Sequence, residues 1–144
     1  MKDFIADNLL AYCRALDLHE ADASLLGLWQ VLEKLMGTDR YDDLIDRLAR
    51  IFRDHADARL IANHVRLRRN QTVHTTRSIS EEADAILLQA ETMAGQALFF
   101  FLRNAGKFRN LAEIHSFLDL PLDQDKLRRY LKLAEIFIQY QNRK

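Results

Sequence analysis

The sequence predicts an all-α protein, and three observations support that prediction. The 144 residues include only 4 Gly and 1 Pro, so few positions interrupt helices. Hydrophobic residues make up 49% of the chain and recur with the three- and four-residue spacing of amphipathic helices. No internal repeat or low-complexity linker divides the chain. We therefore expect one domain over residues 1–144, a bundle of five to seven helices with its core at about 3–103 and a C-terminal helical elaboration at 108–144.

Two apolar stripes predict the first two helices. Residues 3–18 have amphipathic spacing, and Cys13 falls on the apolar face, where we expect a small buried side chain. A second stripe runs over 25–36 and includes Trp29, which we expect to anchor the core. Gly37 follows directly, in the position of a helix C-cap.

The next segment predicts two helices with a bend between them. Asp39 is a suitable N-cap for a third helix, whose apolar stripe covers residues 41–52. The apolar register shifts across 54–58, so we expect a bend or break there before a stripe at 60–67. On the exposed flank of the third helix the i,i+4 spacing predicts two ion pairs, Asp43–Arg47 and Asp46–Arg50.

The remaining helices follow a polar junction. Thr72–Ser80 is rich in β-branched and polar residues, which predicts a loop or helix junction, with Ser78 or Ser80 as the cap of the next helix. Residues 83–102 carry the clearest helical stripe, and Phe99–Phe101 cannot all face one core, so part of that surface is expected to meet a partner.

Two further helices are expected in the C-terminal elaboration. Asn110 with Glu113 starts a short helix that ends at Leu118. Pro121 prevents its continuation, and Asp123 caps a last amphipathic helix.

Composition limits the class of protein. Lys+Arg and Asp+Glu number 21 each, so any nucleic-acid site must be a local patch. The single Cys allows no disulfide framework, which fits a reducing cytoplasm. The acidic N-terminal residues do not resemble a signal peptide, and no run approaches 18 apolar residues, so we expect no membrane span.

The local basic patch lies between Asp57 and Glu81, an interval without acidic residues. It concentrates positive charge in a chain of zero net charge. Four residues of this patch are candidate ligands of RNA phosphates: Arg66, Arg68, Arg77 and His64. A solvated basic face explains the three arginines equally well, and a core or interface role explains the histidine.

Within this patch Arg69, Asn70 and His74 form an Arg-Asn-x-x-x-His motif. Arg-x-x-x-x-His occurs four times in the chain, and only at Arg69 does Asn follow the arginine. Random placement would give the full triplet about 0.02 times. An arginine can hold a phosphate and stabilise developing charge, a histidine can act as general base or acid near neutral pH, and the Asn can orient either.

Two conditions constrain this site. On a continuous helix, residues five apart point about 140° apart, so Arg69 and His74 converge only if the helix breaks between them or the ligand lies at a dimer seam. No cluster with metal-ligand spacing occurs near the motif, and arginines repel cations, so we expect neither a metal nor another cofactor.

The motif and the helices on either side of it resemble the HEPN superfamily, over roughly residues 40–103. The resemblance implies a metal-independent endoribonuclease that works as a homodimer, with Arg69, Asn70 and His74 facing a shared cleft. It also implies cleavage of RNA by attack of the 2′-OH, and a role as a toxin or phage-defence effector partnered by an antitoxin protein or a nucleotidyltransferase. A tyrosine that follows the motif in some relatives is absent from residues 75–80, which disfavours tyrosine modification. The alternative is a non-catalytic helical dimer that binds nucleotide, RNA or a protein partner.

Overall fold

The computed structural model describes residues 1–74 and 80–142, and the side chains of residues 1–71 and 83–142. Within those ranges the chain is all-α, as predicted, with seven helices and no strand. In chain order they are α1 (Lys2–Leu16), α2 (Ala21–Met36), α3 (Tyr41–Ala49), α4 (His55–His74), α5 (Ser80–Asn104), α6 (Leu111–Leu118) and α7 (Gln124–Gln141).

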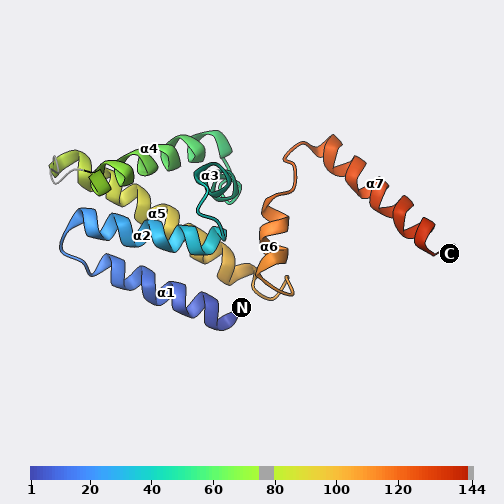
Figure 1. Ribbon diagram of the computed structural model, residues 1–144, viewed down its shortest axis with the longest axis horizontal. Helices are drawn as coiled ribbons and strands as arrows, with labels where there is room; N and C mark the ends of the chain where they lie inside the picture. Colours follow the sequence, from blue (N-terminus) through green and yellow to red (C-terminus); the bar gives the residue numbers. More distant parts are fainter. Residues whose placement is uncertain (75–79, 143–144) are drawn as a thin grey trace.

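Helix α5 is the centre of the bundle, with α1, α2 and α4 packed around it (Figure 1). Its inward stripe is fully buried and ends at Phe101. Helix α2 contributes the largest buried side chain, Trp29, which is 1% exposed, so its predicted role as a core anchor is confirmed. Of the three consecutive phenylalanines only Phe101 is buried, and Phe99 is exposed, as the spacing predicted.

Residues Ala83–Asn104 of α5 are long and apolar enough to cross a membrane, by length and composition alone. The core helix of a helical bundle meets the same criterion. Because α1, α2 and α4 cover the inward stripe of α5, we interpret this segment as the core helix.

The prediction that Cys13 is buried is wrong, because its thiol is exposed. Helix α1 meets the bundle along a narrow stripe that includes Ile5, Tyr12 and Ala15. Cys13 is about 100° around the helix from Tyr12, outside that stripe. Glycine keeps the two helices close, since a Cβ at Gly27 of α2 would lie 2.8 Å from the Cβ of Ala15.

The boundaries of α3 differ from those predicted. Arg40, not Asp39, is the N-cap residue, and the Arg40 backbone N–H donates to Thr38 Oγ1 at 3.1 Å. The helix ends at Ala49, so the break before α4 lies at residues 50–54, slightly earlier than expected. Asp54 marks the end of this break and caps α4, because its side chain accepts a 3.0 Å hydrogen bond from the Asp57 N–H in the first turn of α4.

The two ion pairs predicted along α3 do not form. Asp43 pairs with Arg40 and Asp46 pairs with Arg59 of α4. Arg47, 16% exposed, instead donates from Nε and Nη2 to the two carboxylate oxygens of Asp119, each at 2.7 Å. Sequence spacing identifies neighbours within one helix, whereas tertiary packing here brings the acceptor from the end of α6.

Polar contacts of two residues, Arg47 and His115, fix α6 to the bundle. Arg47 also donates from Nη1 to the Met36 carbonyl at the end of α2, and His115 Nε2 donates to the Leu35 carbonyl at 2.8 Å. The predicted start of α6 is confirmed, since Asn110 Oδ1 accepts from the Glu113 N–H at 3.0 Å. Helix α6 is therefore held against the C-terminal end of α2.

Substitution Arg47→Ala is expected to lower the free energy of unfolding by about 2 kcal/mol, because charge-assisted hydrogen bonds of a mostly buried guanidinium are lost. Urea unfolding followed by circular dichroism measures it. Arg47→Lys is the matched control: it keeps the charge but cannot bind Asp119 through two parallel hydrogen bonds, so it should recover only part of the loss. Full recovery by lysine would contradict the bidentate geometry.

The same pair makes stability depend on pH. The hydrogen bonds from Arg47, helped by its charge, hold the pKa of Asp119 below its usual range against the opposing effect of partial burial. A carboxyl whose pKa is lowered by folding stabilises the protein above its unfolded pKa, and that contribution is lost as the pH falls through the lowered value. Asp119→Asn should therefore narrow the difference in stability between neutral and acidic pH.

Candidate functional site

The candidate site lies where the C-terminal half of α4 packs beside the first turn of α3 and the middle of α2. Three side chains meet there: Arg69 and Asn70 from α4, and Tyr41 from α3. Arg69 Nη1 donates to the Tyr41 hydroxyl at 2.9 Å and lies 3.3 Å from Asn70 Oδ1. The Tyr41 hydroxyl in turn donates to Asn70 Oδ1 at 3.3 Å. The first two residues of the motif are thus held together by one phenol.

Among the described side chains, Glu33 of α2 supplies the negative charge that pairs with Arg69. Its Oε1 lies 4.0 Å from Arg69 Nη2, longer than a hydrogen bond, and each of the two side chains is 25% exposed. The same oxygen accepts a 2.7 Å hydrogen bond from the indole N–H of Trp29. Trp29 therefore holds Glu33 at a distance from Arg69, and its ring also meets Tyr41 edge-on at 6.0 Å between centroids.

One further arginine, Arg66, borders this cluster. Arg66 lies one turn before Arg69 and Asn70, on the same face of α4, and its Cζ is 5.7 Å from the centroid of the Tyr41 ring. The Arg69 Cζ is 5.9 Å from the same centroid, so two guanidiniums contact one electron-rich ring. Arg68 points elsewhere and pairs with Asp22 in the first turn of α2 at 3.1 Å.

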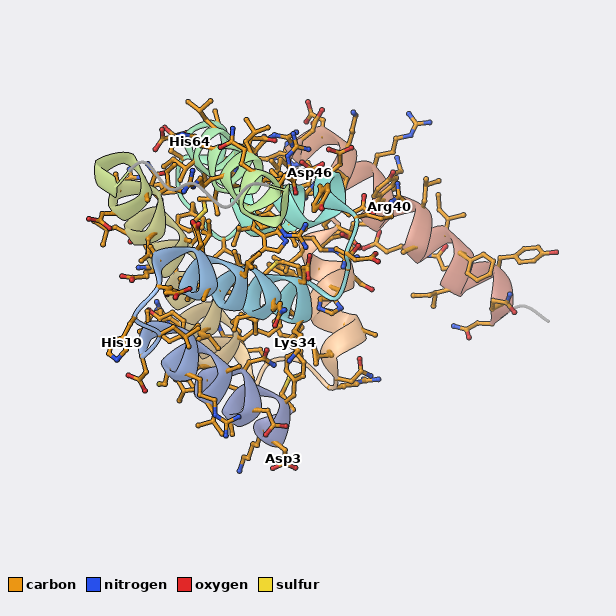
Figure 2. The ribbon with its side chains drawn as sticks, turned by 60° about the vertical axis from the view of Figure 1, so that its left-hand side comes forward. Asp3, His19, Lys34, Arg40, Asp46 and His64 are labelled. Atoms are coloured by element: carbon orange, nitrogen blue, oxygen red, sulfur yellow. The ribbon has the colours of Figure 1, made fainter. Side chains whose placement is uncertain are left out.

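The structure brings together only part of the predicted site. Arg66, Arg69 and Asn70 share the cluster around Tyr41. His64, expected on the apolar side of its helix, is instead exposed on the outer side of α4 (Figure 2), because it is about 140° around the helix from Arg69. Arg77 lies outside the described residues.

The backbone of α4 extends through His74, the last residue of the helix, while its side chain lies outside the described part. Helix α4 is continuous from Arg69 through His74, so the first of the two conditions for their convergence, a helix break between them, is not met. The predicted junction within Thr72–Ser80 includes residues 75–79, which lie outside the described residues. By backbone register, positions 69 and 74 lie about 140° apart around the axis of α4.

Sequence reasoning missed Tyr41 and Glu33 as parts of the site. Tyr41 belongs to the apolar stripe of its helix, which indicates only that it faces the bundle, whereas Glu33 is a charged residue outside the stripe of the second helix. They precede Arg69 in the sequence by 28 and 36 residues. A local motif carries no signal for contacts at that separation. Chemically, the cluster can present a fixed guanidinium and an amide to a ligand. The buried Arg69 Nε makes no hydrogen bond within the described part of the chain.

Comparison of the chain with known proteins found no matching family model, no matching curated protein and no matching solved structure. The motif and the contacts around Tyr41 are therefore the features from which a function can be inferred.

Proposed function

We propose that the protein is a HEPN-type, metal-independent endoribonuclease that acts in the cytoplasm as a homodimer. One observation carries the proposal: Tyr41 holds Arg69 and Asn70 side by side, within the Arg-Asn-x-x-x-His motif, at the arginine-rich end of α4. A guanidinium fixed before substrate arrives needs little reorganisation to bind a phosphate.

In the proposed reaction His74 removes the proton from a ribose 2′-OH, whose oxygen attacks the adjacent phosphorus. The bond from phosphorus to the 5′-oxygen breaks, and an imidazolium returns a proton to that oxygen. The products are a 2′,3′-cyclic phosphate and a 5′-hydroxyl. Arg69 stabilises the additional negative charge on the phosphate oxygens, and Asn70 orients the phosphate or the imidazole.

A second copy of the chain solves a geometric problem in this scheme. Because α4 is helical through His74, positions 69 and 74 of one chain lie on different sides of the helix axis. Two motifs facing each other across a dimer seam would supply arginine from one chain and histidine from the other. Such a ribonuclease would suit a toxin or phage-defence effector, controlled by an antitoxin protein or a nucleotidyltransferase.

A second candidate is a non-catalytic helical dimer that binds nucleotide, RNA or a protein. The observation that favours it is that Arg69 is already engaged, by Tyr41 at 2.9 Å and by the charge of Glu33 at 4.0 Å. In this case the cluster stabilises the junction of α2, α3 and α4, and Arg66 contributes affinity rather than catalysis.

The test is incubation of the purified protein with 5′-labelled RNA in EDTA, with analysis of the product ends. We expect cyclic-phosphate ends from the wild type, and a loss of at least ~100-fold in rate for Arg69→Ala and for His74→Ala. Arg103→Ala, which removes an exposed arginine at the end of α5, is the matched control and should cleave normally.

The two variants together test the composite site. Mixing Arg69→Ala protein with His74→Ala protein should restore up to about a quarter of the wild-type activity if the motifs act across a dimer, because some mixed dimers carry one intact site. Absence of cleavage by the wild type, with RNA binding that Arg69→Ala weakens, would overturn the enzyme proposal and support the binding module.

A further inference from the structure

Helix α7 is the least covered element of the molecule and projects away from the bundle (Figure 1). None of its residues is buried. Between Tyr130 and Tyr140, seven large apolar side chains are each 51–63% exposed. Exposed apolar area of that extent on a well-capped helix, with Asp123 accepting from two backbone N–H groups, indicates an interaction surface.

The apolar residues of α7 form a defined stripe by helical register. It passes through Leu127, Leu131 and Ile138 on one side, and Lys126 and Arg128 border it. The second half of the helix is apolar around most of its circumference, so the apolar stripe is wide there.

An apolar groove lies between the first half of α4 and the first half of α5. It has a volume of about 320 Å³ and its wall is mainly apolar, formed by residues such as Ile61, Leu88 and Met93. Asp54 and Asp57, both exposed, border it together with Arg53, so its rim carries a net negative charge.

We propose that α7 of one copy of this chain lies in the α4/α5 groove of a second copy, and that the exchange is reciprocal. The apolar stripe would enter the groove, and Lys126 and Arg128 would approach Asp54 and Asp57 at its rim. A reciprocal arrangement forms a closed two-fold dimer, with the same pair of surfaces used twice.

The occupant is a second copy because α7 is directed away from its own bundle. Arg47 and His115 fix α6 to the end of α2, and only residues 119–123, including Pro121, join α6 to α7. Charge complementarity and the apolar groove then select a second bundle of the same chain. The inference uses neither Arg69 nor its cluster, but it describes a contact of the homodimer on which the proposed ribonuclease site depends. Arg69→Ala should abolish cleavage and leave the dimer intact, which separates failure of one proposal from failure of the other.

Light scattering on a sizing column, over about 1–100 µM protein, tests the dimer. We expect a mass near twice the 16.8 kDa of one chain, and a shift to one chain mass in Phe137→Asp. Leu10→Asp, at a half-exposed position on α1, is the matched control and should remain dimeric. A Phe137→Asp protein that dimerises like the wild type would overturn the proposal.

Charge reversal tests which surfaces meet. Asp57→Arg and Arg128→Asp should each raise the dissociation constant about tenfold, and the combined variant should return to within a few-fold of the wild type. Asp57 is chosen because Asp54 caps α4. Additive weakening in the combined variant would overturn the assignment of the groove.

A disulfide cross-linking experiment distinguishes a second copy from the other possible partners of α7 and of the groove. In a Cys13→Ser background, mixed Leu88→Cys and Ile138→Cys chains should cross-link to each other. A cross-link only within one doubly substituted chain would show that α7 covers its own groove. A monomer that binds anionic lipid vesicles through α7 would show a membrane surface as the partner, and either result would overturn the proposal.

Discussion

Substitution Gly37→Ala is expected to lower the free energy of unfolding by about 3 kcal/mol, from two separate causes. Gly37 closes α2 with φ +66°, in the left-handed region that an L-residue adopts only at a cost of about 1 kcal/mol or more. An alanine Cβ there would also lie 2.7 Å from Nδ1 and 2.9 Å from Nε2 of His115, and closer still to Cε1. The imidazole must move, and its hydrogen bond to the Leu35 carbonyl is lost.

Thermal unfolding provides the measurement. For a chain of this length, 3 kcal/mol corresponds to a decrease of roughly 6–12 °C in the midpoint. His115→Ala is the informative background, because it removes the collision and leaves only the backbone cost. Gly37→Ala should then cost about 1 kcal/mol. An equal cost in both backgrounds would show that the left-handed conformation alone determines the effect.

Substitution Trp29→Ala is expected to cost about 3–5 kcal/mol, which is a large part of the stability of an average domain. The ring is almost completely buried between α2 and the rest of the bundle, and it contacts Tyr41 edge-on. Its removal leaves a cavity of nearly the size of the side chain and deprives Glu33 of the indole N–H donor. Urea unfolding monitored by circular dichroism measures the loss.

Trp29→Phe separates packing from hydrogen bonding. Phenylalanine keeps most of the apolar volume, so the expected cost falls to about 1–2 kcal/mol. Glu33, without its donor, can then approach Arg69 more closely than 4.0 Å. A folded Trp29→Phe protein with reduced binding or cleavage of RNA would follow from that approach, whereas unchanged RNA handling would show that Glu33 does not limit Arg69.

The helices were predictable because their evidence is local. Stripe periodicity and end signals located α2 with its Gly37 cap, α6 with Asn110 and α7 with Asp123. The errors arose where a distant contact decided the outcome. Arg47 pairs with Asp119 rather than with a residue of its own helix, and Cys13 is exposed because α1 is covered along only one stripe.

In the candidate site, too, the local features were predicted and the contacts between distant residues were missed. Composition and spacing selected Arg69 and Asn70, which the structure places together, and placed Arg66 in the same basic segment. Tyr41 and Glu33 come from other helices, and only tertiary packing brings them to Arg69. His64 was misplaced because α4 has a mixed pattern, in which apolar and polar residues do not separate clearly into two faces.

The position of Trp29 also gives the protein an intrinsic fluorescence signal beside the candidate site. It is the sole tryptophan of the chain, and its indole N–H donates to Glu33, whose carboxylate lies beside Arg69. Indole emission is sensitive to the charge and hydrogen bonding around the ring. A phosphate that displaced Glu33 from the neighbourhood of Arg69 would therefore change the fluorescence spectrum, and occupancy of the site can be followed without any label.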